Sequence, residues 1–472
     1  KDRGDTLETP IIIAGGPCVC NPEPLADFID AFQIGEGEEV MLEFLDLLND
    51  YKKQGKSRKE FLIAASGIEG VYVPSLYDIE YKEDGTINSV TALEGAPEVI
   101  NKRVVSDLDN IFYPDKFVVP FVEVVHDRVV HEIFRGCIRG CRFCQAGYIY
   151  RPLRERKPET LLSLANDLLS KSGFDEISLS SLSTSDFKGL PCLTDGLLKI
   201  TEEKKIGLSL PSLRIDNFSL ELMEKVQKVR KSGITFAPEA GTQRLRDVIN
   251  KNITEENILE STALLFAGGW TNVKLYFMIG LPTETDTDVV GIAELAGRVL
   301  DVYFDIPKEE RAKNINITVS SSSFVPKPFT AFQWVGMNSR EEIIRKQKLI
   351  KDSIPSKRIR YTYHDNQTSY LEGVFSRGDR RLCKSIIKAV ELGCKFDGWG
   401  EFFDFDKWMQ AFSETGIDPD FYTARERLYD EVLPWDHIDV GVTKEFLMCE
   451  NEKAKAESTT PHCRLECSKC GA

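Results

Sequence analysis

One stretch of sequence decides the fold of this protein: Val129-Val130-His131-Glu132-Ile133-Phe134-Arg135-Gly136-Cys137-Ile138-Arg139-Gly140-Cys141-Arg142-Phe143-Cys144. Its first six residues have the composition of a buried β-strand, and three cysteines follow in the spacing Cys-x3-Cys-x2-Cys. Three thiolates on a short loop can hold three irons of a [4Fe–4S] cluster and leave the fourth iron open. A structural zinc site usually takes four protein ligands, and no further cysteine follows until Cys192. The spacing therefore favours a cluster, around which Gly136 and Gly140 let the backbone fold closely.

Around this stretch the chain alternates short apolar runs with amphipathic helical segments, which is typical of a parallel sheet covered by helices. The predicted strands are Val129–Phe134, Glu176–Ser181, Ile206–Leu210, Ile234–Phe236, Val273–Phe277 and Ile315–Ser320, and the predicted helices between them are Thr160–Lys171, Ser219–Lys231, Glu255–Phe266 and Asp286–Leu300. No Gly-x-Gly-x-x-Gly turn follows the first strand, so an ordinary dinucleotide-binding domain is disfavoured. The pattern predicts an α/β fold with a partial (β/α)6 TIM-like barrel, whose chemistry lies at the carboxyl ends of the strands.

The Cys137-x3-Cys141-x2-Phe143-Cys144 loop after the first of six βα repeats resembles that of radical S-adenosylmethionine (SAM) enzymes. The resemblance covers residues 127–345. It implies that the open iron binds the amino and carboxylate groups of SAM. It also implies that one electron cleaves the sulfonium and releases a 5′-deoxyadenosyl radical, which abstracts hydrogen from a substrate.

The same resemblance implies SAM-binding residues at the later strand ends. Ser180 and Ser181 end the second strand, where the family binds the methionyl amino group, although serines here replace the usual glycines. The other predicted contacts are Arg214 for the methionyl carboxylate, Glu239 and Gly241 for the ribose, and Ile279 and Gly280 for the adenine. Arg214 is equally well explained by a structural salt bridge.

Residues 1–55 alternate strands and helices like one edge of a doubly wound sheet. Gly15-Gly16-Pro17 and Gly35-Glu36-Gly37-Glu38 resemble the closing part of the cobalamin-binding domain that precedes many radical SAM enzymes. This resemblance implies cobalamin as a further cofactor, although the sequence contains no Asp-x-His-x-x-Gly cobalt-ligating motif. The alternative is the edge of any flavodoxin-like domain. Two strands do not make such a sheet alone, so we expect the chain to be a fragment.

The remaining segments carry one further motif. Residues 56–126 are predicted to form a small β insert or linker, and residues 346–455 a mainly helical region. Residues 456–472 form a tail in which Cys463, Cys467 and Cys470 repeat the Cys-x3-Cys-x2-Cys spacing, preceded by His462. The tail is predicted to bind zinc or an auxiliary cluster, and the alternative is an unliganded, reactive tail.

The composition restricts the partners of the protein. Among 472 residues, 60 Lys and Arg and 75 Asp and Glu give a net charge of −15, which disfavours indiscriminate binding to nucleic acid or anionic lipid. No uncharged stretch is long enough to span a membrane, and the start shows no signal-peptide pattern, so we expect a soluble, cytoplasmic protein. Between Arg135 and Lys157 seven basic residues accompany one acid, Glu155. This segment is explained either by an anionic partner, RNA included, or by ion pairs within the fold, which we favour.

We therefore expect a radical SAM enzyme that acts on an unknown substrate and takes electrons from a donor such as flavodoxin or ferredoxin. Bound cobalamin would favour methyl transfer or related radical chemistry. One alternative is a methylthiotransferase-like RNA-modifying enzyme without cobalamin. Another is a non-catalytic iron–sulfur or zinc protein with a regulatory role. The sequence alone does not identify the substrate, because fold and cofactor do not determine it.

Overall fold

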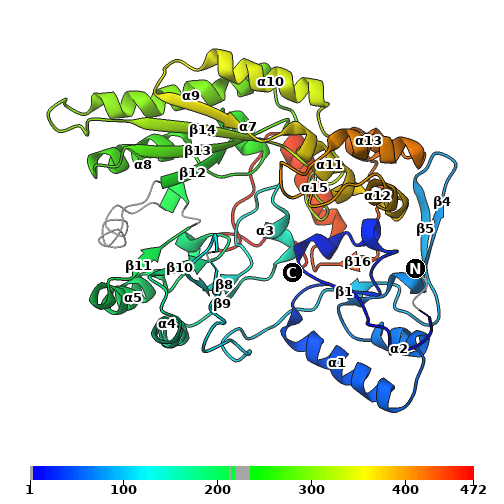
Figure 1. The fold of residues 1–472 in the computed structure, drawn as a ribbon. Coiled ribbons are helices and arrows are strands. Elements are labelled where there is room, and N and C mark those ends of the chain that lie inside the picture. Colours follow the sequence, from blue (N-terminus) through cyan, green and yellow to red (C-terminus); the bar gives the residue numbers. More distant parts are fainter. Residues whose placement is uncertain (1–3, 123, 212–213, 218–233) are drawn as a thin grey trace.

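The computed structural model describes residues 4–122, 124–211, 214–217 and 234–472 (Figure 1). Its strands are β1 (Ile13–Ala14), β2 (Ala31–Gln33), β3 (Val71–Tyr72), β4 (Tyr77–Tyr81), β5 (Ile87–Ala92), β6 (Ile100–Asn101), β7 (Val129–Glu132), β8 (Phe134–Arg135), β9 (Arg154–Glu155), β10 (Glu176–Ser180), β11 (Gly207–Ser209), β12 (Ile234–Glu239), β13 (Asn272–Ile279), β14 (Asn316–Ser323), β15 (Ile359–Tyr363) and β16 (Ile438–Asp439). Its helices are α1 (Gly37–Lys53), α2 (Arg58–Ala65), α3 (Gln145–Ile149), α4 (Pro158–Ser172), α5 (Leu190–Lys204), α7 (Gln243–Val248), α8 (Glu255–Ala267), α9 (Asp286–Asp305), α10 (Arg340–Ser353), α11 (Asn366–Arg377), α12 (Leu382–Glu391), α13 (Phe405–Glu414), α14 (Pro419–Thr423) and α15 (Lys444–Lys455).

Two parallel sheets form the centre of the protein. One has the order β11-β10-β7 and the other the order β12-β13-β14-β15. In Figure 1 helices α4 and α5 cover the first sheet, and α8, α9 and α10 cover the second. Parallel strands with helices in the crossovers confirm the α/β class and place the carboxyl ends of the strands together within each sheet.

Local sequence explains where these elements begin. Thr254 caps α8 with a capping box, in which its hydroxyl accepts from the Asn257 N–H at 3.2 Å and the Asn257 side chain accepts from the Thr254 N–H at 3.0 Å. Strand β13 alternates buried and exposed positions, and Val273, Leu275 and Phe277 point into the core. Both elements match their predicted positions because their signals are local.

The core is divided between the two sheets. Val129, Ile177 and Leu208 anchor one apolar cluster under α4 and α5. Phe236, Leu275, Ile317 and other residues of the second sheet pack with α8, α9 and α10 in another cluster. Each of the two sheets thus buries its apolar face under its own helices. The loop from Cys137 to Cys144 follows shortly after β7, at the edge of the first sheet.

The N-terminal segment forms a separate three-stranded sheet, in which β1 and β2 are parallel and β3 is antiparallel to β2. Phe32 and Tyr72 of this sheet share one apolar cluster with Tyr148 of α3 and with Trp435 and Phe446 near the C-terminus. Strand β16 also pairs with β6, so that Ile438 lies beside Ile100. The N-terminal sheet, α3 and the C-terminal segment therefore pack against one another.

The structure extends the prediction for the central sheets in one place. The six predicted strands are present, but β15 adds a seventh that pairs in parallel with β14 inside the region expected to be mainly helical. Its short Ile-Arg-Tyr-Thr-Tyr run has no periodicity that distinguishes it from a loop. The predicted helix Ser219–Lys231 lies outside the described residues. Among the residues that are described, no helix is long and apolar enough to cross a membrane.

Candidate active site

The loop from Cys137 to Cys144 follows β8 and leads directly into α3. The three cysteine side chains are partly buried and lie near enough that the Cys141 thiol influences both Cys137 and Cys144 electrostatically. Gly136 has φ +87°, and a Cβ there would lie 2.7 Å from the Pro152 carbonyl oxygen. Only glycine permits the chain to enter the loop this closely to the strand pair β8–β9.

The electrostatics of these thiols depend on burial. Burial, with a smaller contribution from Cys141, raises the pKa of Cys137 to about 11, although the Arg139 N–H donates to its sulfur at 3.4 Å. Burial likewise raises the pKa of Cys144 to about 12, and the Gly147 N–H and Lys251 oppose this shift. The Cys137 and Cys144 thiols are therefore protonated in the folded chain, and a metal would have to displace these protons in order to bind.

A charged network ties the cysteine loop to the ends of the first sheet. Arg139 donates from Nε to Asp186 at 2.8 Å and from Nη1 to Asp216 at 3.0 Å. Asp186 follows β10 and Asp216 follows β11, so one buried guanidinium fixes both strand ends relative to the loop.

Two predicted SAM-binding residues, Arg214 and Glu239, converge on one lysine that sequence reasoning missed. Arg214 donates to the Lys251 carbonyl oxygen at 3.1 Å and to Asp216 at 2.9 Å. The Lys251 Nζ donates to Glu239 at 3.1 Å and lies 5.9 Å from the centre of the Phe143 ring. Lys251 therefore connects the cysteine loop with the ends of β11 and β12.

A sequence signal for Lys251 existed in its flanking asparagines. Asn250 and Asn252 both have positive φ, at 52° and 51°, and asparagine tolerates this region better than most residues. Glu239 also has a positive φ, 68°, where the pairing of β12 with β13 shifts register. Such backbone strain at a residue other than glycine or asparagine is typical of a functional position.

The remaining predicted residues lie at the expected strand ends. Ser180 ends β10, and the Ser181 hydroxyl is 3.0 Å from the Thr184 hydroxyl. Ile279 is buried at the end of β13, and Gly280 follows with φ +84°. Within the described ranges, no hydrogen bond or ion pair joins these residues to the Arg214 or Glu239 side chains.

Gly241 has a packing role that the sequence did not indicate. A Cβ at this position would lie 2.3 Å from the backbone nitrogen of Ile292 in α9. The glycine therefore allows α9 to approach the end of β12. Its predicted contact with ribose remains a prediction.

The C-terminal segment holds the cysteine loop from the other side. Arg142 is fully buried and donates to Glu450 of α15 at 3.1 Å and to the Ser458 carbonyl oxygen at 2.8 Å. The Asn250 side chain donates to the carbonyl oxygens of Gly140, at 2.9 Å, and Thr460, at 3.1 Å. Residues far apart in sequence thus fix the shape of the loop.

The basic residues around the loop are directed inward. Arg154 makes two 2.7 Å hydrogen bonds to Glu36, and Arg135 pairs with Glu132 at 3.0 Å. Together with the pairs of Arg139 and Arg142, these contacts agree with the interpretation of the segment as a source of ion pairs within the fold. These arginines do not form a basic surface.

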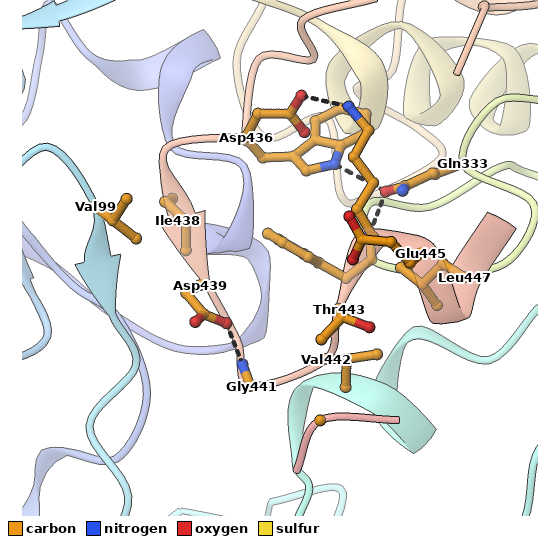
Figure 2. A pocket seen from close by; sticks show the side chains of 14 residues that line it. Val99, Gln333, Asp436, Ile438, Asp439, Gly441, Val442, Thr443, Glu445 and Leu447 are labelled. Atoms are coloured by element: carbon orange, nitrogen blue, oxygen red, sulfur yellow. Dashed lines mark hydrogen bonds and ion pairs between the residues drawn. The ribbon is translucent and has the colours of Figure 1, made fainter. Parts of the chain in front are cut away.

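A cavity of about 440 Å³ lies beside the C-terminal tail (Figure 2). Val99, Ile438, Thr443 and Gly471 are among its lining residues, and none of the predicted SAM-binding residues is. Asp436 and Lys444 both line the cavity, and the Lys444 ammonium donates to the Asp436 carboxylate at 2.8 Å. This cavity is therefore separate from the candidate active site.

The residues around Cys137, Cys141 and Cys144 fit a [4Fe–4S] cluster. They supply three neighbouring thiols, a backbone N–H directed at one sulfur, and the nearby cation Lys251. In the described ranges no group of three or more His, Cys, Asp and Glu side chains is compact enough for a single metal ion. The ligands of a cubane bind different irons and therefore stand farther apart than the ligands of one ion.

Comparisons with known proteins agree with this site. The profile of the radical SAM superfamily matches residues 131–296, and that of the N-terminal region of radical SAM proteins matches residues 1–74. An uncharacterized protein of Methanocaldococcus jannaschii is 30% identical over 431 residues, which are 88% of this chain and 82% of that protein. The ribosomal protein uS12 methylthiotransferase RimO of a Thermoanaerobacter species is 23% identical and aligns over 57% of this chain and 64% of its own length.

Among solved structures, the radical SAM methyltransferase TsrM of Kitasatospora setae aligns with a TM-score of 0.43 and 13% identity. The alignment covers 69% of this chain and 57% of that chain.

The parallel α/β sheets and the two family profiles identify the chain as an enzyme of the radical SAM class. This chain belongs to the radical SAM superfamily.

Proposed function

We propose that Cys137, Cys141 and Cys144 hold a [4Fe–4S] cluster and that the ends of β10 to β13 bind SAM for reductive cleavage. The observation that carries the proposal is the convergence of Arg214, Glu239 and the cysteine loop on Lys251. When bound and reduced, the cluster supplies the electron that cleaves SAM to methionine and a 5′-deoxyadenosyl radical, which takes a hydrogen atom from the substrate.

The residues of the chain orient SAM by charge. Arg214 can turn its guanidinium to the methionyl carboxylate without leaving Asp216 unpaired, because Asp216 also accepts from Arg139 at 3.0 Å. The Lys251 ammonium, which also lies near the Phe143 ring, holds the Glu239 carboxylate at the end of β12, where it can accept from the ribose hydroxyls. Ser180 and Ser181 offer their carbonyl and hydroxyl oxygens to the methionyl amino group.

Anaerobic reconstitution with iron and sulfide, then dithionite and SAM, tests this proposal. We expect about four irons per chain at this loop and formation of 5′-deoxyadenosine. Cys144→Ala should abolish the product, whereas Cys192→Ser, which changes an exposed cysteine on α5, should not. Four irons bound at the loop without 5′-deoxyadenosine would overturn the proposed chemistry.

Cobalamin remains a prediction for residues 1–55. The parallel pair β1–β2 and the following helix α1 agree with the edge of a doubly wound sheet. We expect the chain to retain hydroxocobalamin through gel filtration, and loss of all cobalt would refute the prediction. Bound cobalamin would favour methyl transfer as the reaction.

Methylthio transfer is a second candidate, because RimO and related methylthiotransferases are among the relatives. It predicts insertion of sulfur as well as a methyl group into the substrate. An RNA substrate is the less favoured form, since the arginines near the loop are paired within the fold.

A further inference from the structure

The C-terminal tail lies directly on the loop that carries the first cysteine triplet. The Cys463 N–H donates to the Ile138 carbonyl oxygen at 3.0 Å, so that the first cysteine of the tail adjoins the residue after Cys137. Thr460 is fixed to Asn250 by a 2.8 Å hydrogen bond from its N–H, and Asn250 also holds Gly140. The folding of the chain thus brings two segments of identical cysteine spacing together.

The far end of the tail is anchored as well. The Cys470 carbonyl oxygen accepts from the Thr443 N–H at 2.9 Å, and Thr443 caps α15. Cys470 is buried, whereas Cys463 and Cys467 are exposed. The triplet therefore spans from the apolar core to the surface.

The buried cation Arg151 lies near the Cys463, Cys467 and Cys470 triplet. Arg151 is 4% exposed, and its Nε and Nη2 donate to the carbonyl oxygens of Gly147, at 3.0 Å, and Arg139, at 3.2 Å. Its Nη1 is buried without a hydrogen-bond partner, and the guanidinium has no ion pair among the described residues; it lies 4.9 Å from the centre of the Tyr148 ring and 5.8 Å from that of Phe446. Arg151 lies close enough to Cys463 and Cys470 that both thiols influence it electrostatically.

A buried guanidinium that pairs with no carboxylate is costly, because carbonyl oxygens and aromatic rings only partly replace its hydration. A neutral thiol does not repay this cost, whereas metal-bound thiolates carry negative charge. His462 also precedes Cys463, and its Nδ1 is buried without a hydrogen-bond partner. Imidazole is a suitable fourth ligand for iron in a thiolate cluster.

We propose that Cys463, Cys467 and Cys470 hold a second iron–sulfur cluster, which Arg151 stabilises from the side of the first cysteine loop. The identical Cys-x3-Cys-x2-Cys spacing assigns it the same [4Fe–4S] type. This inference goes beyond the proposed SAM cleavage, because the second cluster binds whether or not the first reacts.

Two complementary variants test the proposal by iron content. The reconstituted wild-type chain should bind about eight irons, and both a C463S/C467S/C470S variant and a C137A/C141A/C144A variant should bind about four. In the latter variant, the reduced protein should keep an electron paramagnetic resonance signal that SAM leaves unchanged. Since Cys467 is exposed, the single variant Cys467→Ser should fold normally and still lower the iron content, whereas Cys449→Ser on α15 should not.

About four irons in the wild type, unchanged in the tail variant, would overturn the second cluster. Zinc in the tail in place of iron would overturn it as well. Neither result affects the proposed cleavage of SAM, which is read from 5′-deoxyadenosine and the Cys144→Ala variant.

Discussion

The Arg142 guanidinium in the cysteine loop donates to the Glu450 carboxylate in α15 at 3.1 Å, and neither side chain is more than 2% exposed. The two residues are 308 positions apart in the sequence. Glu450 also accepts from Lys453 at 2.9 Å and from the Thr460 hydroxyl at 2.8 Å. This carboxylate therefore joins the candidate active site to both the last helix and the tail.

Glu450→Gln should lower the free energy of unfolding by about 3 kcal/mol, because it leaves the buried charge of Arg142 without its carboxylate. It should also speed iron loss from the reconstituted protein. Chemical denaturation and iron release to a chelator measure the two effects. Glu452→Gln, at an exposed position of the same helix, is the control, and equal effects of the two substitutions would refute the role of Glu450.

Gly241→Ala should destabilise the protein by about 2 to 3 kcal/mol, because the new methyl group would clash with the backbone of α9 at Ile292. The matched control is Gly398→Ala, since a Cβ there meets nothing within 4 Å. Thermal unfolding compares the two variants. A Gly241→Ala protein of normal stability that no longer binds SAM would instead assign Gly241 to the ligand.

Lys251→Met should raise the KM for SAM by about tenfold, because Glu239 loses the ammonium that positions it, whereas the backbone carbonyl that holds Arg214 is kept. Lys251→Arg should restore part of the affinity, and the iron content should stay unchanged. The measurement is 5′-deoxyadenosine formation against SAM concentration. Lys274→Met, at a solvent-facing lysine that contacts Tyr276, serves as the control. An unchanged KM would exclude a positioning role.

His131 should make the stability of the first sheet dependent on pH. Burial lowers the pKa of His131 to about 4, while its ring nitrogen donates to the Leu161 carbonyl oxygen at 2.9 Å. The folded protein therefore binds this proton less readily than the unfolded chain, so stability is full above pH 6.5 and falls as the pH approaches 4.

From pH 7 to pH 5 we expect a loss of about 2 kcal/mol attributable to His131. Denaturation curves of wild type and His131→Gln at both pH values measure it, because glutamine keeps a donor without titrating. The same loss in both proteins would show that other groups cause the dependence.

Local patterns accounted for much of the fold. The six predicted strands and helices such as Glu255–Phe266 are present because apolar periodicity and capping residues act within a few positions of each other. Strand β15 escaped prediction because only its pairing with β14 distinguishes its five residues from a loop. Similarly, the packing role of Gly241 depends on α9, which lies some fifty positions later.

The sequence by itself determined the class of protein, because cluster binding needs three thiols at fixed spacing on one loop, and that requirement is local. It also indicated the strand ends at which SAM is expected. Only the tertiary structure decided that Lys251 joins Arg214 to Glu239, that Glu450 balances Arg142, and that the tail lies on the cysteine loop beside Arg151. Those contacts join residues distant in sequence, and their energies depend on burial and charge compensation, which exist only in the folded chain.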